Sequence, residues 1–297
     1  MMRLRPILLS ITPSILPLTI ATSSFSTFPL GPPTSSIVPP GSCQLDETWK
    51  ACKLTSSKSL TQDTKLLTFS TPDTTSPLNL PTCACILASG GEDPTSDSAA
   101  PYVRPYTPVS TNSLSGSFDL IVKEYPTGGL SKYICNMNVG DTLDFKHIPF
   151  NVKRQYPFNR THVAMIAGGT GVTPMIQALH ALLGSDEDET KVTLLYGSRR
   201  KEDIIARDAL EVWERMSGGR LKVVHVLSEE EGDWGGERGH IDKGIIQKYL
   251  PGKEQDVEIF VCGPEGMYGS LCGPRGEEGV DGILGEMGYG PDQVVKF

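Results

Sequence analysis

The chain of 297 residues lacks the patterns that mark several classes of protein. Its net charge of −8 argues against a nucleic-acid binder, which usually carries a basic surface. The five histidines form neither an HxxxH nor an HExxH pattern, so the sequence gives no support for a metal site. The seven cysteines are odd in number, scattered, and spaced unlike any iron–sulfur motif. They are typical of reduced intracellular thiols and not of a disulfide framework.

Acidic residues are absent from the first 45 positions. The same stretch carries Arg3, Arg5, a short apolar run and many hydroxyl residues, a composition typical of an organelle-targeting segment. Prolines interrupt the apolar run, which is also short for a bilayer span. We expect residues 1–45 to be a targeting segment, with a secretory signal or a membrane anchor as open alternatives. The expected location is mitochondrial, at the outer membrane or in the intermembrane space, and the alternative is the endoplasmic reticulum membrane.

Two halves with different patterns follow this segment. In residues 46–155 the runs KLLTFST, CACILAS, FDLIVKEY and TLDFKHI predict short strands separated by turns. Several such strands without a helical pattern indicate a small antiparallel β-barrel. Cys83 and Cys85 stand in one of these runs, where both side chains would point to the same face.

In residues 156–297 strands and helices alternate. The strands are expected at HVAMIAGG, KVTLLYGS, LKVVHVLS and VEIFVCGP, with helices ending at Leu183 and covering residues 203–216 and 242–250. This βαβ alternation predicts a parallel, Rossmann-like sheet with helices on its faces. The expected fold is therefore an antiparallel barrel followed by an α/β domain.

Residues 162–183 combine a short apolar strand, a glycine turn and a helix start. The turn contains three glycines that let the backbone bend sharply and approach a ligand: Gly168, Gly169 and Gly171. Thr173 is a suitable N-cap and Pro174 suits the first helical position. Such a helix N-terminus presents free N–H groups and partial positive charge to a phosphate. Because the spacing is not GxGxxG, an ordinary βα turn stays open as the alternative.

Two further motifs in the first half contain residue types that bind phosphates and aromatic rings. In RPYTPVS, Arg104 offers a planar fork for a pyrophosphate and Tyr106 a flat face for an aromatic ring system. The alternative is a proline-rich turn with a surface arginine. In VKEYPTGGLS, Gly128 and Gly129 allow close backbone approach, and Ser131 can cap a helix that starts at Lys132. A hairpin turn followed by a short helix is the alternative.

RPYTPVS, VKEYPTGGLS, GGTGVTPM and CGPEGM, in this order, resemble the motifs of the NADH–cytochrome b5 reductase family of ferredoxin-reductase-like flavoenzymes. The similarity runs from about Asp46 to Phe297, and YPTGGLS, FKHI and the C-terminal residues are closest to the mitochondrial branch. The resemblance implies an FAD-binding β-barrel and an NADH-binding α/β domain. It also implies hydride transfer from NADH to FAD and single-electron transfer to cytochrome b5 or a similar acidic haem protein.

The resemblance assigns roles to residues at the motif positions. It places FAD on Arg104, Pro105, Tyr106, Thr107, Val122, Lys123, Tyr125, Gly129, Leu130, Ser131 and Thr173. It places NADH on Gly168, Gly169, Thr170, Gly171, Pro174, Met175, Cys262, Gly263, Pro264 and Met267. Lys123, Thr173 and Cys262 are the candidate catalytic residues. Lys123 would act electrostatically on the reduced flavin, and Cys262 could instead be a small buried thiol.

Two charged segments bear on specificity. Family members often have an acid after the LKVVHVL-like strand that disfavours NADPH; here Ser228 holds that place, followed by three glutamates. These acids would still repel a 2′-phosphate, so we expect NADH. Residues 121–162 hold six basic residues that suit docking of an acidic haem protein, unless they form an ordinary solvated face: Lys123, Lys132, Lys146, Lys153, Arg154 and Arg160.

Three features depart from the family pattern or have no assigned role. HIPFNVKRQYPF replaces a glycine–proline turn, which puts the FAD contact near His147 in doubt. Residues 269–282 are expected to form a flexible loop, and Phe297 to pack near the flavin or at the domain interface. A relative with another electron acceptor, or a flavin- or nucleotide-binding module without turnover, stays open as an alternative function.

Overall fold

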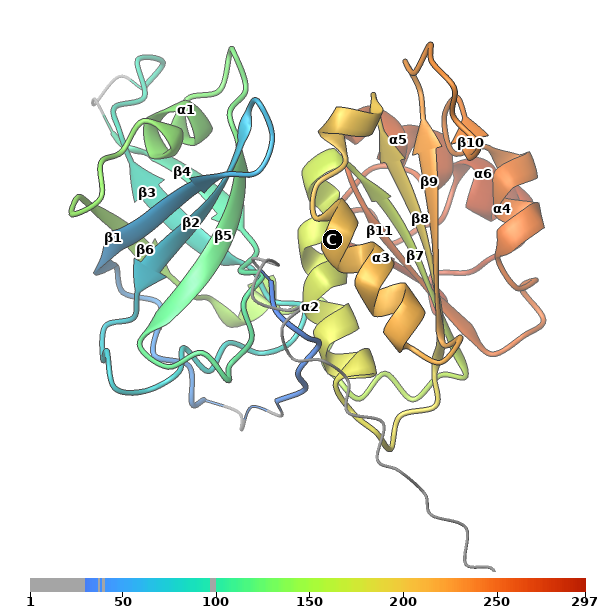
Figure 1. Cartoon of the computed structure of the whole chain (residues 1–297), viewed down its shortest axis with the longest axis horizontal. Helices are drawn as coiled ribbons and strands as arrows, with labels where there is room; N and C mark the ends of the chain where they lie inside the picture. The colour runs from blue at the N-terminus through green and yellow to red at the C-terminus, as the bar shows by residue number, and fades with distance from the viewer. Residues whose placement is uncertain (1–29, 37, 39–40, 97–99) are drawn as a thin grey trace, which may run out of the picture.

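The computed structural model describes residues 30–36, 38, 41–96 and 100–297. Two bodies lie side by side in Figure 1, a β-barrel and a parallel sheet flanked by helices. The barrel sheet has the order β4-β3-β6-β1-β2-β5, and every neighbouring pair is antiparallel. Its strands are β1 (Lys50–Ser59), β2 (Thr64–Ser70), β3 (Ile86–Gly90), β4 (Tyr102–Tyr106), β5 (Ser117–Lys123) and β6 (Thr142–Lys146). The predicted barrel is confirmed.

Three phenylalanines form the centre of the barrel core. Phe69 on β2, Phe118 on β5 and Phe145 on β6 are at most 1% exposed. The ring of Phe145 meets the other two edge-on, at centroid distances of 5.0 and 5.2 Å. They meet inside the barrel because alternate residues of each strand point to the same face.

Two barrel strands, β1 and β4, have no counterpart among the runs predicted from the sequence. The CACILAS strand is also shorter than expected, because β3 begins only at Ile86. Cys83 has a φ of 58°, in the left-handed region, and is buried at the domain interface, whereas Cys85 is half-buried. The prediction of one strand carrying both thiols on one face is therefore wrong.

The second body is a parallel sheet of order β10-β9-β8-β7-β11-β12. Its strands are β7 (His162–Gly168), β8 (Lys191–Ser198), β9 (Leu221–Leu227), β10 (Glu237–Arg238), β11 (Val257–Cys262) and β12 (Val294–Lys296). Helices α2 (Val172–Leu183) and α3 (Arg207–Met216) pack on the face toward the barrel. The other face is covered by α4 (Lys243–Tyr249), α5 (Glu265–Leu271) and α6 (Gly282–Glu286). The predicted α/β domain is confirmed.

Helix starts differ from the sequence expectations. Helix α2 follows a 3-10 turn over residues 169–171, and its N-cap is Gly171 instead of Thr173. Thr173 lies inside the first turn, where its hydroxyl donates to the carbonyl of Thr170 (3.1 Å). Helix α3 starts at Arg207, after a separate 3-10 turn at 201–203. Glycine and hydroxyl caps are close alternatives at a helix start, and the contacts that choose between them are not local.

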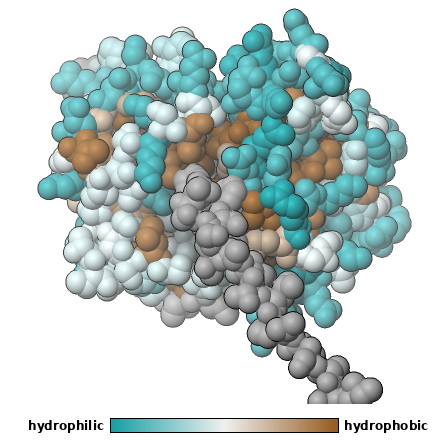
Figure 2. Space-filling view, viewed as in Figure 1, coloured by the Kyte–Doolittle hydropathy of each residue, from teal (hydrophilic) through white to brown (hydrophobic). Residues whose placement is uncertain are grey.

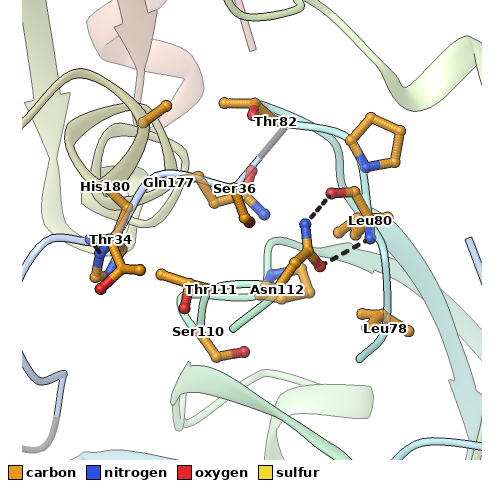
Figure 3. A pocket seen from close by; sticks show the side chains of 13 residues that line it. Thr34, Ser36, Leu78, Leu80, Thr82, Ser110, Thr111, Asn112, Gln177 and His180 are labelled. Carbon is orange, nitrogen blue, oxygen red and sulfur yellow. Dashed lines mark hydrogen bonds between the residues drawn. The ribbon is translucent and has the colours of Figure 1, made fainter. Parts of the chain in front are cut away.

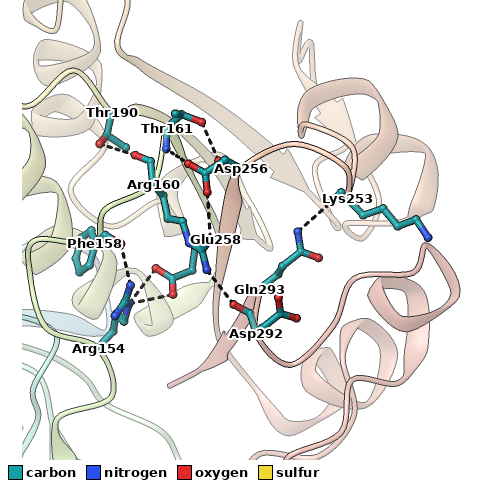
Figure 4. Close-up of polar contacts among 10 residues, drawn as sticks. All are labelled: Arg154, Phe158, Arg160, Thr161, Thr190, Lys253, Asp256, Glu258, Asp292 and Gln293. Atoms are coloured by element: carbon teal, nitrogen blue, oxygen red, sulfur yellow. Dashed lines mark hydrogen bonds and ion pairs between the residues drawn. The ribbon is translucent and has the colours of Figure 1, made fainter.

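An ion pair between a half-buried arginine and a buried glutamate attaches the segment between the domains to the parallel sheet. The Nε of Arg154 donates to Oε2 of Glu258 on β11 (3.0 Å) and lies 2.9 Å from Oε1, and its Nη2 donates to the carbonyl of Phe158 (2.8 Å; Figure 4). The Glu258 side chain is 5% exposed. The predicted domain boundary at residue 155 lies in this segment, between the end of β6 and the start of β7.

The described part of the predicted leader packs against both bodies. In residues 30–36, which we call the N-terminal strap, the carbonyl of Gly31 accepts from the indole of Trp213 on α3 (3.0 Å). The amide of Thr34 donates to Nδ1 of His180 on α2 (3.2 Å). Leu45, farther along, is buried in the barrel core. Residues 1–29 lie outside the described residues.

A small polar cavity of about 40 Å³ lies beneath the strap (Figure 3). It is bounded by the strap, by two barrel loops and by α2, and Gln177 and His180 of that helix face it.

On the face drawn in Figure 2, apolar side chains gather where the two bodies meet. Within the described residues, no helix is long and apolar enough to cross a bilayer.

Candidate functional site

The glycine turn at the carboxyl end of β7 lies directly against the end of β11. The two strands pair in parallel with Ala167 opposite Cys262. A Cβ added at Gly171 would lie 2.1 Å from the carbonyl oxygen of Cys262, closer than any real contact. A Cβ at Gly168 would lie 2.8 Å from the sulfur of Met267. The structure thus brings the GGTG and CGPEGM motifs together, as the sequence predicts, and only glycine permits this approach.

The turn also presents an open backbone surface. Gly169 has a φ of 54°, and a Cβ added there would meet nothing within 4 Å. No side chain caps the first turn of the twelve-residue helix α2. Free N–H groups at a helix start, beside an open glycine, form a suitable site for a phosphate. These residues therefore fit the pyrophosphate of a dinucleotide.

Cys262 ends β11, and Pro264 is the N-cap of α5, so the CGP turn lies at the carboxyl edge of the sheet. Ligands of open α/β sheets bind at this edge. Burial raises the pKa of the Cys262 thiol to about 11, with smaller effects from Tyr268, Arg275 and Cys85. The thiol is therefore protonated at neutral pH and is not poised as a nucleophile.

The barrel presents its RPYT motif on β4. Arg104 and Pro105 are exposed, and Tyr106, at the end of the strand, is half-buried. The Arg104 guanidinium donates to the carbonyl of Val103 (2.8 Å). Burial raises the pKa of the Tyr106 phenol, so it stays a neutral hydroxyl at every physiological pH. After β4 the chain crosses to β5, where Pro108 bridges to Leu120.

Tyr125 connects the barrel motifs to the glycine turn. Its side chain is 46% exposed, and its hydroxyl lies 3.5 Å from the hydroxyl of Thr170. Tyr125 and Thr170 are 45 residues apart in the sequence. Their motifs, VKEYPTGGLS and GGTGVTPM, therefore meet across the domain interface. A flat cofactor held by the barrel and a nucleotide held by the sheet could meet at this place, because an exposed aromatic face and open backbone N–H groups adjoin there.

Other barrel candidates have different surroundings from those expected. Lys123 forms an ion pair with Asp63 (3.0 Å) and is 15% exposed. The side chains of Val122 and Leu130 pack inside the barrel core. No sequence pattern indicated Asp63, because the contact depends on the pairing of β2 with β5, in which Thr64 lies opposite Lys123.

The helix after the GG pair starts earlier than predicted. Helix α1 covers Leu130–Cys135, its N-cap is Gly129, and Ser131 does not cap it. A Cβ added at Gly129 would lie 2.3 Å from the ring of Tyr102 on β4, so this glycine is required for close packing. The predicted Ser131 cap is wrong, whereas the expected close backbone approach at Gly129 is present.

The three glutamates expected to disfavour NADPH lie after β9. Ser228 donates its amide to the carbonyl of Ser198 at the end of β8 (3.1 Å). Glu230 accepts from the amide of Lys201 (2.9 Å), and Glu229 lies 4.0 Å from the guanidinium of Arg200. The acids are thus partly balanced by the basic turn that follows β8.

The six basic residues expected to form one docking face are not equivalent. Lys123, Arg154 and Arg160 form ion pairs with Asp63, Glu258 and Asp256. The other three basic residues have different surroundings. Lys132 lies on α1, Lys146 over the ring of Trp49, and Lys153 over the ring of Phe150. The paired cations attract an acidic partner less strongly, because each one is next to a carboxylate.

The loop expected to be flexible is held by a lysine. Lys296 on β12 donates to the carbonyls of Pro274, Glu277 and Gly279, at 2.7–3.1 Å. Arg275 of this loop also influences the pKa of Cys262.

Phe297 packs its ring against Phe260 at a centroid distance of 5.3 Å, consistent with the interface role. His147 is 8% exposed, and its Nδ1 has no hydrogen-bond partner among the described residues.

Comparison with known proteins agrees with this geometry. Residues 51–149 match the oxidoreductase FAD-binding domain, and residues 165–273 match the oxidoreductase NAD-binding domain. A protein of Neosartorya fischeri named NADH-cytochrome b5 reductase 2 is 39% identical over 267 residues, covering 85% of this chain and 78% of its own length. This chain belongs to the NADH-cytochrome b5 reductase family. Its cofactors are FAD and NADH.

A second relative supports the family, and a solved structure supports the fold. NADH-cytochrome b5 reductase 2 of Neurospora crassa is 37% identical over 261 residues, covering 85% of this chain and 74% of its own length. The crystal structure of the cytochrome b5 reductase domain of Ulva prolifera nitrate reductase aligns with a TM-score of 0.74 at 27% identity. It covers 86% of this chain and 100% of that domain. The ferredoxin-reductase-like fold predicted from the sequence is confirmed.

Proposed function

We propose that this chain is an NADH-dependent flavoenzyme that delivers electrons to cytochrome b5. FAD, when bound, supplies the redox chemistry: it accepts a hydride from NADH and releases the electrons singly. The observation that carries the proposal is the meeting of barrel and sheet motifs at Tyr125 and Thr170. The similarity to proteins named NADH-cytochrome b5 reductase 2 supports the same acceptor.

The residues of this chain bind and orient the two groups. Arg104 would pair with the FAD pyrophosphate, and Tyr106 would lie beside the flavin ring. The glycine turn at 168–171 would hold the NADH pyrophosphate, and the CGP turn at Cys262 would cover the nicotinamide. Lys123 forms an ion pair with Asp63. The carboxylate reduces the positive charge that Lys123 would offer to the cofactor.

Anaerobic stopped-flow absorbance of the purified protein tests the proposal. NADH should rapidly remove the flavin band, and subsequent addition of cytochrome b5 should restore it. NADPH should act more slowly, because the glutamates after β9 repel a 2′-phosphate even though the basic turn after β8 partly balances them. A flavin band that NADH does not bleach would leave a binding module without turnover. Bleaching by NADH without reoxidation by cytochrome b5 would indicate a different acceptor.

For docking of the acceptor, we propose that Lys132, Lys146 and Lys153 contribute most. They lie in the basic segment predicted from the sequence and have no acidic partner within 4 Å in the described chain. Lys132 and Lys153 are exposed and Lys146 is half-buried; charges at the surface act mainly on the association rate, and their effect weakens with salt. The apparent KM for cytochrome b5 should rise several-fold on going from 20 to 200 mM salt. A KM independent of salt would contradict the docking proposal.

We also propose a mitochondrial location, from the Arg-containing and acid-free start of the chain. Uptake of the full chain into isolated mitochondria, compared with a chain that starts at Leu30, tests it. Equal behaviour of the two chains, or insertion into microsomes instead, would contradict this location.

A further inference from the structure

The N-terminal strap and the residues after it join the two bodies a second time, in addition to the segment between β6 and β7. At the α/β domain, Leu30 packs on the core cluster that contains α2 and α3. The carbonyl of Gly31 accepts from Trp213 on α3, and the amide of Thr34 donates to His180 on α2. Trp213 and His180 are 1% and 4% exposed, and their rings meet at a centroid distance of 4.8 Å. The strap is therefore bound to a buried pair of side chains.

Beyond the strap, the side chain of Gln44 binds the barrel. Its Nε2 donates to the carbonyls of Ser76 (2.9 Å) and Pro77 (2.8 Å), and its Oε1 accepts from the amide of Asp73 (2.8 Å). The next residue, Leu45, is buried in the barrel core. The chain thus leaves the α/β domain and enters the barrel before β1 begins, and each end of this crossing is held by hydrogen bonds.

The direct contact between the two bodies at α2 is mainly apolar. Four barrel side chains share one core cluster with this helix: Leu66, Cys83, Val109 and Ile121. Burial of apolar surface is non-directional, so it holds the bodies together without fixing the angle between them. Beside this cluster the small polar cavity lies between the barrel loops and α2 (Figure 3). Hydrogen bonds are directional. The two bonds of the strap, with one from the Gln177 amide to the Ala84 carbonyl (3.2 Å), therefore fix this angle.

We propose that the N-terminal strap sets the angle of α2 to the barrel, so that His180 and Trp213 are positioning residues for hydride transfer. Helix α2 starts at the glycine turn, and His180 lies nine residues after Gly171, a distance of about 14 Å at 1.5 Å per residue. Because a helix moves as a stiff unit, a shift at His180 moves the glycine turn relative to Tyr125 of the barrel. A misplacement of about 1 Å can lower a reaction rate about a hundredfold. The proposal rests on the proposed function, because NADH must bind at the glycine turn.

The test removes both hydrogen bonds of the strap in the full chain. Trp213→Phe deletes the indole donor, and His180→Phe deletes the Nδ1 acceptor, while both changes keep a buried aromatic ring in place. The two are combined, because each alone leaves one bond. Tyr289→Phe is the control. It deletes a hydroxyl that donates to the Pro251 carbonyl (2.5 Å), in the core on the other face of the sheet.

Anaerobic stopped-flow reduction by NADH separates alignment from binding. In the double variant the limiting rate of flavin reduction should fall about three- to tenfold, whereas the Kd for NADH from the same titration should change less than about twofold. Hydrogen–deuterium exchange without NADH gives a second readout. It should become faster in residues 30–36 and also at the start of α2, in residues 169–173. The control should change neither the rate nor the exchange.

An unchanged rate, with or without faster exchange in residues 30–36, would overturn the proposal, because the strap would then only cover α2. An equal fall of the rate in Tyr289→Phe would also contradict it, since a general loss of hydrogen bonding would then explain the effect. If the double variant does not fold, Pro32→Gly with Pro33→Gly loosens the strap from outside both cores, and the same outcomes apply. If NADH does not reduce the unaltered protein, the proposed function fails, and exchange at residues 169–173 alone decides whether the strap positions α2.

Discussion

His180 on α2 is a buried base whose protonation opposes folding. It is 4% exposed, and burial lowers its pKa from 6.5 to about 4. Because Nδ1 accepts from the Thr34 amide, the neutral ring carries its proton on Nε2, which has no partner in the described chain. The unfolded chain binds this proton more readily than the folded chain. Stability is therefore complete above about pH 6.5 and decreases as the pH falls toward 4.

Removal of this titration should make the protein less sensitive to acid. Between pH 7 and pH 5 the unaltered protein should lose about 2 kcal/mol more unfolding free energy than His180→Gln. Urea denaturation at the two pH values measures the difference. His225, whose pKa burial also lowers to about 4, is present in both proteins and cancels. Equal acid sensitivity of the two proteins would show that His180 titrates normally in the fold.

The Cys262 thiol should react slowly. With a pKa raised by burial to about 11, its thiolate population at pH 7.5 is about a hundredfold below that of an unperturbed cysteine. Alkylation by iodoacetamide, followed by peptide mass spectrometry, should therefore be at least tenfold slower in the native protein than in urea. Alkylation of the native protein as fast as in urea would show that the Cys262 thiol is a reactive nucleophile.

At the scale of elements, a substitution of glycine in the turn between β7 and α2 should cost more than a substitution of glycine in strand β8. In Gly171→Ala the new methyl group would overlap the Cys262 carbonyl, and neither backbone can yield. We expect a loss of about 2–4 kcal/mol in unfolding free energy and failure of NADH to bleach the flavin. Gly197→Ala on β8, where the nearest atom would be 3.6 Å away, is the control and should cost less than about 1 kcal/mol. Similar melting temperatures for both variants would contradict the close approach.

Much of this element structure could be predicted from the sequence. The apolar strand, the glycine turn and the helix through Leu183 follow from local composition, and so does the helix predicted over residues 242–250, which is α4. The start of α2 could not be predicted, because Gly171 is chosen by its contact with β11, 91 residues away. The ion pair of Lys123 with Asp63 likewise depends on strand pairing across 60 residues. The sequence motifs that share the predicted site do meet in the fold, at Gly171 with Cys262 and at Tyr125 with Thr170, but the ion pair of Lys123 was not predicted.

At the scale of the whole molecule, the Arg154–Glu258 pair joins the interdomain segment to the sheet. Replacing Glu258 leaves Arg154 without its carboxylate, but the Arg154 side chain is 33% exposed and keeps its hydrogen bond to the Phe158 carbonyl. We therefore expect Glu258→Gln to lower the unfolding free energy by about 1–3 kcal/mol, less than the loss of a partner in a fully buried pair. Glu286→Gln removes a surface partner of Lys243, with side chains 49% and 67% exposed, and should have little effect. Chemical denaturation of the three proteins measures both values, and equal stability of the two variants would contradict the role given to the pair.

The contacts of the N-terminal strap bear on the targeting role proposed for the start of the chain. A Cβ at Gly184 would lie 2.2 Å from the amide of Ser35, so the strap lies in direct contact with the end of α2. A processing peptidase that cuts before Leu30 leaves the hydrogen bonds of Gly31 and Thr34 intact. A cut after Leu45 removes both hydrogen bonds and, with Thr34 and Ser36, one wall of the small cavity at His180. If the targeting segment proposed above is removed on import, the fold therefore constrains the cleavage site as well as the peptidase.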